Sequence, residues 1–304
     1  MTEYAISVQG LIKRYRNVTA VDGISFEVKR GEVFGLLGPN GAGKTTILEC
    51  LEGMRKSDGG TLSVDGCNPQ LEGRKMRLIM GVQLQSTSLP EAIRPGEAMT
   101  LICAWHGLSP RFDLLRHFGL DPQEKKQYCE MSTGQKRRLH LALALASDPT
   151  VVVLDEPTTG LDVQGRAQLH DAIRELKATG VTILLATHDM AEAESLCDRI
   201  AIIIRGRIAA TGTPAQITSA GNAETQITLR TKSNCLLPGR DIGSARFLKQ
   251  SENYGIWLCH DTADAVMELL KEVQQAGDTV EDLRVERPSL EERFLELVER
   301  GVTQ

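Results

Sequence analysis

The residues with the clearest chemical potential form a glycine-rich loop between a short apolar run, residues 33–37, and a helical pattern, residues 45–51. The loop fits the phosphate-binding pattern G-x-x-x-x-G-K-[ST], whose glycines let backbone N–H groups turn toward phosphate oxygens. We expect Lys44 to reach the β- and γ-phosphates and the Thr45 hydroxyl to ligate Mg²⁺. A glycine-rich turn without a ligand is the alternative, and the flanking strand and helix patterns favour the phosphate site. The residues of the loop are Gly38, Pro39, Asn40, Gly41, Ala42, Gly43, Lys44, Thr45 and Thr46.

A second candidate segment is an apolar run that ends in two carboxylates. Residues 151–154 are Val-Val-Val-Leu, and Asp155 and Glu156 follow directly. A buried strand of this kind delivers its polar end to the sheet edge at which phosphates bind. We expect Asp155 to hold Mg²⁺ through water and Glu156 to polarise the attacking water. Alone, such a run is typical of a strand leading into a turn, but the phosphate loop favours the catalytic interpretation.

A short motif ahead of this strand reads Met131-Ser132-Thr133-Gly134-Gln135. Considered locally, Ser132 could simply cap a helix, because a serine hydroxyl can accept a hydrogen bond from the amide three residues on. The motif also resembles the signature sequence of ABC ATPases, usually LSGGQ, which stands ahead of the Asp-Glu strand in that family. The resemblance covers the chain from Tyr4 to about Ile217, with the motifs in the right order.

Four further residues stand where the resemblance places functional groups. Tyr15 matches the aromatic residue that stacks on adenine. Gln85 matches the glutamine that contacts Mg²⁺ and the attacking water and senses the membrane partner, although Gln83 is a nearby alternative. His188 matches the switch histidine that contacts the γ-phosphate, and Asp162 matches the D-loop aspartate that links the two sites of a dimer.

In ABC ATPases the signature binds the γ-phosphate of a nucleotide held by the opposing subunit. The resemblance therefore assigns Ser132, Thr133, Gly134 and Gln135 to ATP binding and implies a head-to-tail dimer, taken here as a homodimer. Thr133 departs from the glycine of the family, and its Cβ is expected to crowd a backbone that approaches phosphate. The subgroup that this chain is most similar to tolerates threonine, so we expect an active site.

The elements that position these residues follow from the apolar pattern. Continuous apolar strands that alternate with helices predict a parallel sheet covered on both faces. The resemblance implies the α/β P-loop NTPase fold of ABC ATPases, with a mixed core sheet, an antiparallel β subdomain and a helical subdomain at about 86–146. The segment 139–146 is interpreted as a buried helix, because alanine and leucine favour helices. The expected core strands are 33–37, 151–154, 181–186 and 200–204, and the helices between them are 163–178 and 190–197.

The change of sequence pattern in the C-terminal part of the chain predicts a separate small α+β domain at 219–304, after an ATPase domain at 1–218. Its expected strands are 225–229, 255–259 and 280–285, and its expected helices are 264–275 and 289–299. Residues 288–297, Pro-Ser-Leu-Glu-Glu-Arg-Phe-Leu-Glu-Leu, resemble the tail of daunorubicin-resistance exporter ATPases. Locally the same residues form an amphipathic helix, and both interpretations can hold.

Composition limits the partners. A formal net charge of −5 over 304 residues gives no basic surface, so no nucleic acid is expected. Seven scattered cysteines without a CxxC pair indicate reduced thiols. No apolar stretch is long enough to cross a bilayer, and no signal peptide is visible. We expect a cytoplasmic chain, held at the inner face of the cell membrane by a separate integral-membrane permease.

The resemblance implies an ATP-binding and ATP-hydrolysing subunit, with ATP and Mg²⁺, that powers an exporter of drugs or other hydrophobic compounds. Two alternatives remain. An importer ATPase shares every catalytic motif, and only the tail and the subgroup resemblance favour export. A soluble ABC ATPase that regulates a non-transport process is the other, although the chain has neither a second cassette nor a long coiled-coil insertion.

Overall fold

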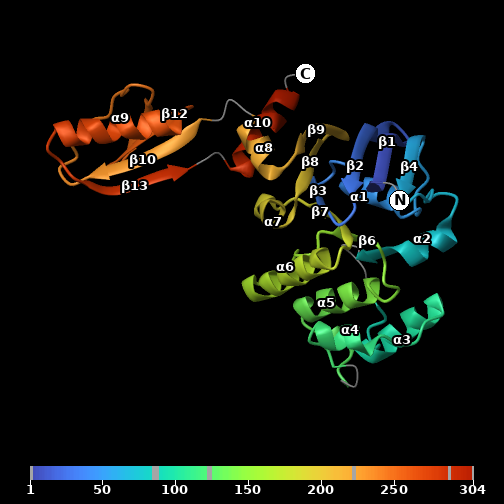
Figure 1. Cartoon of the computed structure of the whole chain (residues 1–304). Helices are drawn as coiled ribbons and strands as arrows, with labels where there is room; N and C mark the ends of the chain where they lie inside the picture. The colour runs from blue at the N-terminus through green and yellow to red at the C-terminus, as the bar shows by residue number, and fades with distance from the viewer. Residues whose placement is uncertain (1–2, 84–88, 122–124, 221–223, 287–288, 303–304) are drawn as a thin grey trace. The chain divides into compact units, whose positions relative to one another are not determined.

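The computed structural model describes residues 3–83, 89–121, 125–220, 224–286 and 289–302. The chain divides into two compact units, Met1–Pro214 and Ala215–Gln304. This division falls at the start of α8 (Pro214–Ser219), whereas the sequence places a boundary near the end of that helix. Each unit is built around its own β-structure (Figure 1).

The first unit contains a six-stranded sheet in the order β5-β6-β7-β3-β8-β9. The first five strands are parallel and β9 is antiparallel to β8. Every residue of β3, β6 and β7 is buried, which explains their continuous apolar runs. The strands are β5 (Met80–Gln83), β6 (Val151–Asp155), β7 (Thr182–Thr187), β3 (Val33–Leu37), β8 (Arg199–Ile204) and β9 (Arg207–Gly212).

The register of this sheet brings three strand ends together. Leu37 of β3 pairs with Thr187 of β7, and Asp155 of β6 pairs with Ala186 of the same strand. The phosphate loop, the two carboxylates and the segment after β7 therefore begin at one edge of the sheet.

A three-stranded antiparallel sheet, in the order β2-β1-β4, completes the core. Its strands are β1 (Tyr4–Tyr15), β2 (Val18–Lys29) and β4 (Gly59–Val64). These strands share one hydrophobic core with α1 (Lys44–Leu51) and the six-stranded sheet. Phe26 stacks on Phe34 at 5.3 Å between ring centroids, which joins the two sheets across that core. The mixed sheet and the antiparallel subdomain match the fold that the resemblance implies.

The helical part of this unit comprises α2 (Gly73–Ile79), α3 (Pro95–His106), α4 (Phe112–His117), the 3₁₀ turn Tyr128–Glu130 and α5 (Thr133–Ala144). In α5 the five consecutive residues Leu139 to Leu143 are all buried, so this helix is enclosed on several sides. The helical interpretation of its alternating leucines and alanines is confirmed. The helices α6 (Val163–Ala178) and α7 (Met190–Leu196) follow β6 and β7.

The second unit contains a four-stranded antiparallel sheet in the order β11-β12-β10-β13. Trp257, Leu229 and Leu269 form part of its core, against which α9 packs one face. Among the residues that the structure describes, no helix of either unit is both long and apolar enough to cross a membrane. The elements are β10 (Thr225–Thr231), β11 (Arg246–Ser251), β12 (Tyr254–Cys259), α9 (Thr262–Gln275), β13 (Val280–Glu286) and α10 (Leu290–Val302).

Candidate nucleotide site

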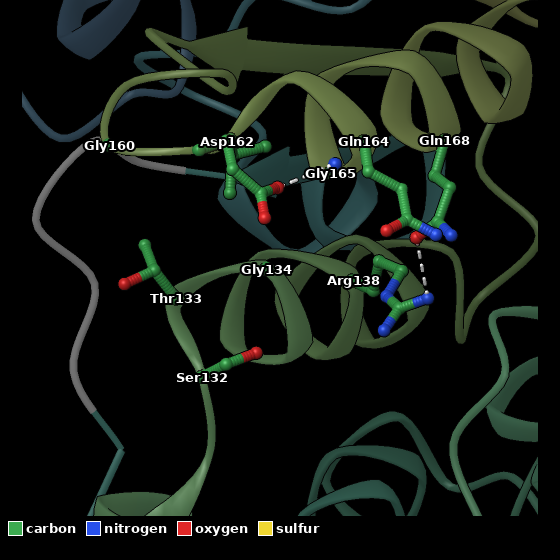
Figure 2. Close-up of a pocket in the computed structure, with 10 residues that line it drawn as sticks. Ser132, Thr133, Gly134, Arg138, Gly160, Asp162, Gln164, Gly165 and Gln168 are labelled. Carbon is green, nitrogen blue, oxygen red and sulfur yellow. Dashed lines mark hydrogen bonds between the residues drawn. The ribbon is translucent and has the colours of Figure 1, made fainter.

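A polar hollow of about 420 Å³ lies where α5 and α6 begin (Figure 2). The Ser132 hydroxyl accepts a hydrogen bond from the Gln135 amide at 3.2 Å, and the Gln135 side-chain oxygen accepts one from the Ser132 amide at 3.0 Å. This reciprocal pair is a capping box. Asp162 caps α6 by a single hydrogen bond, which its side chain accepts from the Gly165 amide at 2.8 Å. The helix cap considered for Ser132 as the local alternative is therefore present, and it does not exclude the signature interpretation.

This hollow brings the signature residues and the D-loop together. Thr133 is exposed, and its Cγ2 would lie 3.7 Å from a Cβ built on Gly160. The crowding expected from Thr133 concerns a bound phosphate and stays a prediction. The lining residues are Ser132, Thr133, Gly134, Arg138, Gly160, Leu161, Asp162, Gln164, Gly165 and Gln168.

A second hollow, of about 280 Å³, lies over the phosphate loop. Gly43 precedes α1 with φ of 107°, and a Cβ at this position would lie 2.5 Å from the backbone oxygen of Ala20. Only glycine can therefore turn the chain into the helix here. The amides at the start of α1 are available to an anion. The lining residues are Ala20, Pro39, Asn40, Gly41, Gly43, Lys44, Thr45, Thr46 and Glu156.

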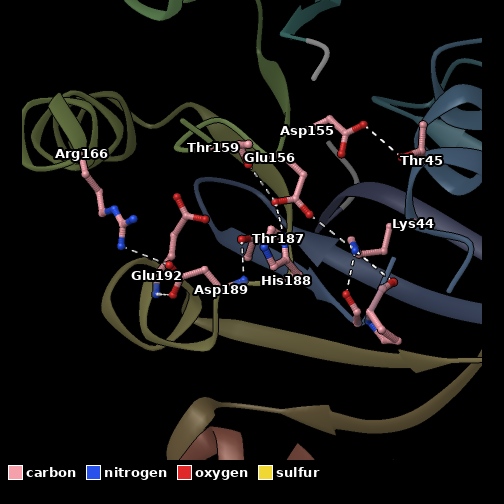
Figure 3. Close-up of polar contacts among 12 residues, drawn as sticks. Lys44, Thr45, Asp155, Glu156, Thr159, Arg166, Thr187, His188, Asp189 and Glu192 are labelled. Carbon is pink, nitrogen blue, oxygen red and sulfur yellow. Dashed lines mark hydrogen bonds and ion pairs between the residues drawn. The ribbon is translucent and has the colours of Figure 1, made fainter. Parts of the chain in front are cut away.

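Lys44 is a buried cation between the loop and a carboxylate (Figure 3). Its Nζ donates to the backbone oxygen of Gly38 at 2.7 Å and to that of Pro39 at 3.3 Å. Its Nζ also lies 3.5 Å from Oε1 of Glu156. The ammonium is thus already fixed in the hollow where phosphates are expected.

Asp155 has the features of a cation ligand. Thr45 Oγ1 donates to one carboxylate oxygen at 3.1 Å, while the other oxygen is buried and has no hydrogen-bond partner. Burial raises the pKa of Asp155, and the Thr45 hydrogen bond offsets this in part. The described residues contain no group of three or more His, Cys, Asp or Glu side chains that could hold a metal. An ion here would take most of its oxygens from nucleotide and water, as Mg²⁺ does at phosphate sites.

Glu156 is the most constrained residue of the site. Its backbone has φ of 49°, the left-handed region, which a residue with a Cβ seldom adopts. Its side chain is buried, with His188 Nδ1 at 2.7 Å and the Thr159 hydroxyl at 3.4 Å from Oε2. Strain of this kind is typical of functional positions, because the surrounding structure must enforce it. The geometry fixes a carboxylate beside Lys44 at the mouth of the phosphate loop.

No described residue lines both hollows. The signature and D-loop residues share one, and Lys44, Thr45 and Glu156 share the other. The expected adenine partner, Tyr15, lines neither hollow and packs against two cations, with its ring 5.2 Å from the Arg55 guanidinium and 5.6 Å from the Lys13 ammonium.

The predicted glutamine, Gln85, lies outside the described residues. Its alternative, Gln83, ends β5 with a buried side chain whose amide atoms have no hydrogen-bond partner.

Sequence reasoning did not single out Glu52, the residue that follows the last turn of α1. Both of its carboxylate oxygens are buried and without hydrogen-bond partners. Burial, with smaller contributions from Asp155 and Glu49, raises its pKa to about 7. A carboxyl whose folded pKa is raised destabilises the fold above that pKa and has no such effect below its unfolded value of 4.5.

Replacing Glu52 with glutamine is therefore expected to raise the free energy of unfolding at pH 8 by on the order of 3 kcal/mol. The gain should shrink steadily between pH 7 and pH 4.5. Urea unfolding at pH 8 and at pH 5 measures both values. Glu91→Gln, an exposed position, is the matched control. Equal stability of the two variants at pH 8 would contradict the prediction.

The family described as ABC transporter matches residues 21–159. The daunorubicin resistance ATP-binding protein DrrA3 of Streptomyces coeruleorubidus is 36% identical over 311 residues, 98% of this chain and 96% of that protein. The Nod factor export ATP-binding protein I of Ralstonia nicotianae is 43% identical over 218 residues, 70% of this chain and 68% of that protein. A solved ATP-binding subunit of an ABC transporter has a TM-score of 0.65 at 30% identity, covering 71% of this chain and 92% of that chain.

These matches agree with the geometry of a phosphate loop, a following carboxylate pair and a capped signature helix. The relative from Streptomyces spans nearly the whole chain, including the second unit. The fold of this family binds nucleotide. The chain therefore belongs to the ABC transporter family as an ATP-binding, ATP-hydrolysing subunit.

Proposed function

We propose that the chain is the motor subunit of an ABC exporter, in which Glu156 activates water for attack on the γ-phosphate of ATP. The observation that carries this proposal is the buried, strained Glu156 carboxylate, held 2.7 Å from His188 and 3.5 Å from Lys44. A carboxylate in this place can accept a proton from water, while His188 fixes its orientation. Lys44 would neutralise charge on the transferred phosphoryl group.

Mg²⁺ is the metal that this site fits. The unpartnered oxygen of Asp155 and the adjacent Thr45 hydroxyl would hold it, directly or through water. When bound, it would neutralise phosphate charge. We also keep Gln85 as a proposed ligand from the resemblance, and Tyr15 as the proposed partner of adenine. Arg55 and Lys13 would then cover part of the Tyr15 ring, so adenine would stack on the part that they leave free.

The working unit is proposed to be a head-to-tail homodimer. The separation of the two hollows supports this, because Ser132, Thr133, Gly134 and Asp162 line one hollow and Lys44 lines the other, with no lining residue in common. Each ATP would be closed in by the signature of the second subunit.

Mixing two inactive variants tests this arrangement. Lys44→Ala removes the phosphate cation, and Ser132→Arg blocks the signature hollow with a bulky charge. A mixed dimer would combine the intact Lys44 of one chain with the intact Ser132 of the other, so one of its two sites is complete. We expect the mixture to regain up to about a quarter of parental turnover, since half of the dimers are mixed and each has one site. A mixture as inactive as each variant alone would contradict the dimer.

The membrane partner is proposed to dock on a largely apolar groove beside α3. Met54, Leu101 and Trp105 are 66%, 59% and 65% exposed, and Met54 and Trp105 line a hollow of about 300 Å³ between α2, α3 and α5. Exposed apolar side chains gathered at one place favour a protein partner. The printed names of the relatives, which concern daunorubicin resistance and Nod factor export, support an exporter of drugs or other hydrophobic compounds. The chain would then lie at the inner face of the membrane.

Co-purification separates this proposal from its rivals. The tagged chain, extracted with detergent, is expected to bring down an integral-membrane protein whose presence changes its ATPase rate. Recovery with ribosomes and an empty membrane fraction would favour a regulatory ATPase and contradict the transporter reading.

A further inference from the structure

Glu192 is a buried carboxyl that none of the proposed roles uses. It lies on α7, the helix after the switch loop, and its side chain is 0% exposed. Neither carboxylate oxygen accepts a hydrogen bond from the described part of the chain. Burial raises its pKa. Since buried polar groups are nearly always hydrogen-bonded, a carboxylate kept in this state requires an explanation.

The carboxylate faces two segments that lead to residues of the proposed site. Thr158 belongs to the loop that begins at Glu156, and Thr187 directly precedes His188. The hydroxyls of both threonines partly offset the rise in the pKa of Glu192, although neither reaches hydrogen-bond geometry. In Figure 3 the Glu192 side chain extends from α7 toward the segment that carries Glu156. One carboxylate therefore adjoins the segments of both the proposed base and the switch histidine.

A third segment reaches the same carboxylate from α6, the helix that Asp162 caps. His170 Nε2 lies 3.6 Å from Glu192 Oε1, and one turn earlier Arg166 Nη1 lies 3.2 Å from Asp189 Oδ2. Arg166 and His170 are four residues apart on α6, and they meet the N-cap and the first turn of α7, so the two contacts lie on facing sides of the helices. The helix after the D-loop therefore contacts the segment after His188 at two points, a hydrogen-bonded ion pair at Arg166 and an approach without a hydrogen bond at His170.

We propose that Glu192 is a positioning residue for ATP hydrolysis, whose carboxyl group lies between the segments of Glu156, Asp162 and His188 and sets their spacing. It does so through its contact with His170 and its electrostatic interaction with Thr158 and Thr187. The inference rests on the roles proposed above for these three residues. A packing role does not account for it, because a leucine would fill the space without the cost of a buried carboxylate. Glu192 lines neither hollow, so its loss should change the chemical step and leave ATP binding intact.

The test is steady-state ATPase kinetics of Glu192→Gln in the full chain. Glutamine keeps the shape and replaces the acid with an amide. We expect kcat to fall at least about tenfold, because small misplacements of reacting groups cost up to about a hundredfold, while KM for ATP stays within about twofold. The melting temperature should not fall, since an amide costs less to bury than a carboxylate. Glu192→Asp, which keeps the carboxyl group, should recover part of kcat.

Two comparisons make each outcome decisive. Glu194→Gln, exposed on the same helix, should leave kcat unchanged. Glu156→Gln tests the proposed function itself: if it keeps full turnover, that function fails. If Glu156→Gln stops turnover and Glu192→Gln does not, only the positioning role fails. A lower kcat that follows a lower melting temperature, without recovery in Glu192→Asp, would mean a merely structural role and overturn the proposal.

Discussion

Replacing Glu156 with glutamine is expected to lower kcat for ATP by at least about two to three orders of magnitude while ATP still binds. The amide keeps the size of the side chain and its contact with His188, but it cannot accept a proton from water. ATP should then remain intact between two subunits, so the variant should form an ATP-dependent dimer on size-exclusion chromatography. Phosphate release measures the first effect and the elution volume measures the second.

The matched control is Glu175→Gln, an exposed carboxylate on α6 whose side chain is 62% exposed. It should hydrolyse ATP at the parental rate and show no lasting dimer. Parental turnover in Glu156→Gln would show that another group activates the water. Loss of turnover without ATP-dependent dimerisation would contradict the composite site but not the role of the base.

Lys44→Ala is expected to weaken ATP binding about a hundredfold or more, because a charge-assisted contact to phosphate contributes roughly 3 kcal/mol. The unpaired Glu156 carboxylate would add repulsion, since it would face the phosphates without the ammonium 3.5 Å away. Fluorescence titration with a labelled ATP analogue measures the dissociation constant. Steady-state ATPase kinetics then measure turnover, which we expect to be lost at ordinary ATP concentrations.

Stability separates this effect from simple misfolding. Lys44 and Glu156 side chains are each 6% exposed, and removing one partner of a buried pair costs about 3–5 kcal/mol. The double variant Lys44→Ala/Glu156→Gln has no unpaired carboxylate, so it should unfold at a higher temperature than Lys44→Ala alone. Equal melting temperatures would mean that the pair does not interact in the folded chain.

The motifs that could be predicted from the sequence are those whose geometry is local. The phosphate loop, the cap at Ser132 and the carboxylates at the end of β6 lie within a few residues of the strand or helix end that orients them. Their contacts therefore follow from residue type and spacing. The roles of these residues in catalysis remain proposals that the variants above test.

The features that escaped prediction depend on residues far apart in the chain. Glu52 and Glu192 look like ordinary helical acids, and they are buried only because other helices and loops cover them. The sequences of β9 and β11 also showed no apolar pattern from which a strand was predicted. β9 alternates between exposed and half-buried residues, while β11 is almost fully exposed, so both are defined by the strands beside them rather than by apolar runs.

The separation of the two hollows has a consequence for how the chain behaves at different concentrations. If each catalytic centre needs surfaces from two chains, hydrolysis per chain should rise with protein concentration and level off when pairing saturates. A membrane partner that holds two chains close together would supply a high effective concentration without any new contact between them. Free chains would then be nearly idle, and ATP would be consumed mainly where two chains are assembled.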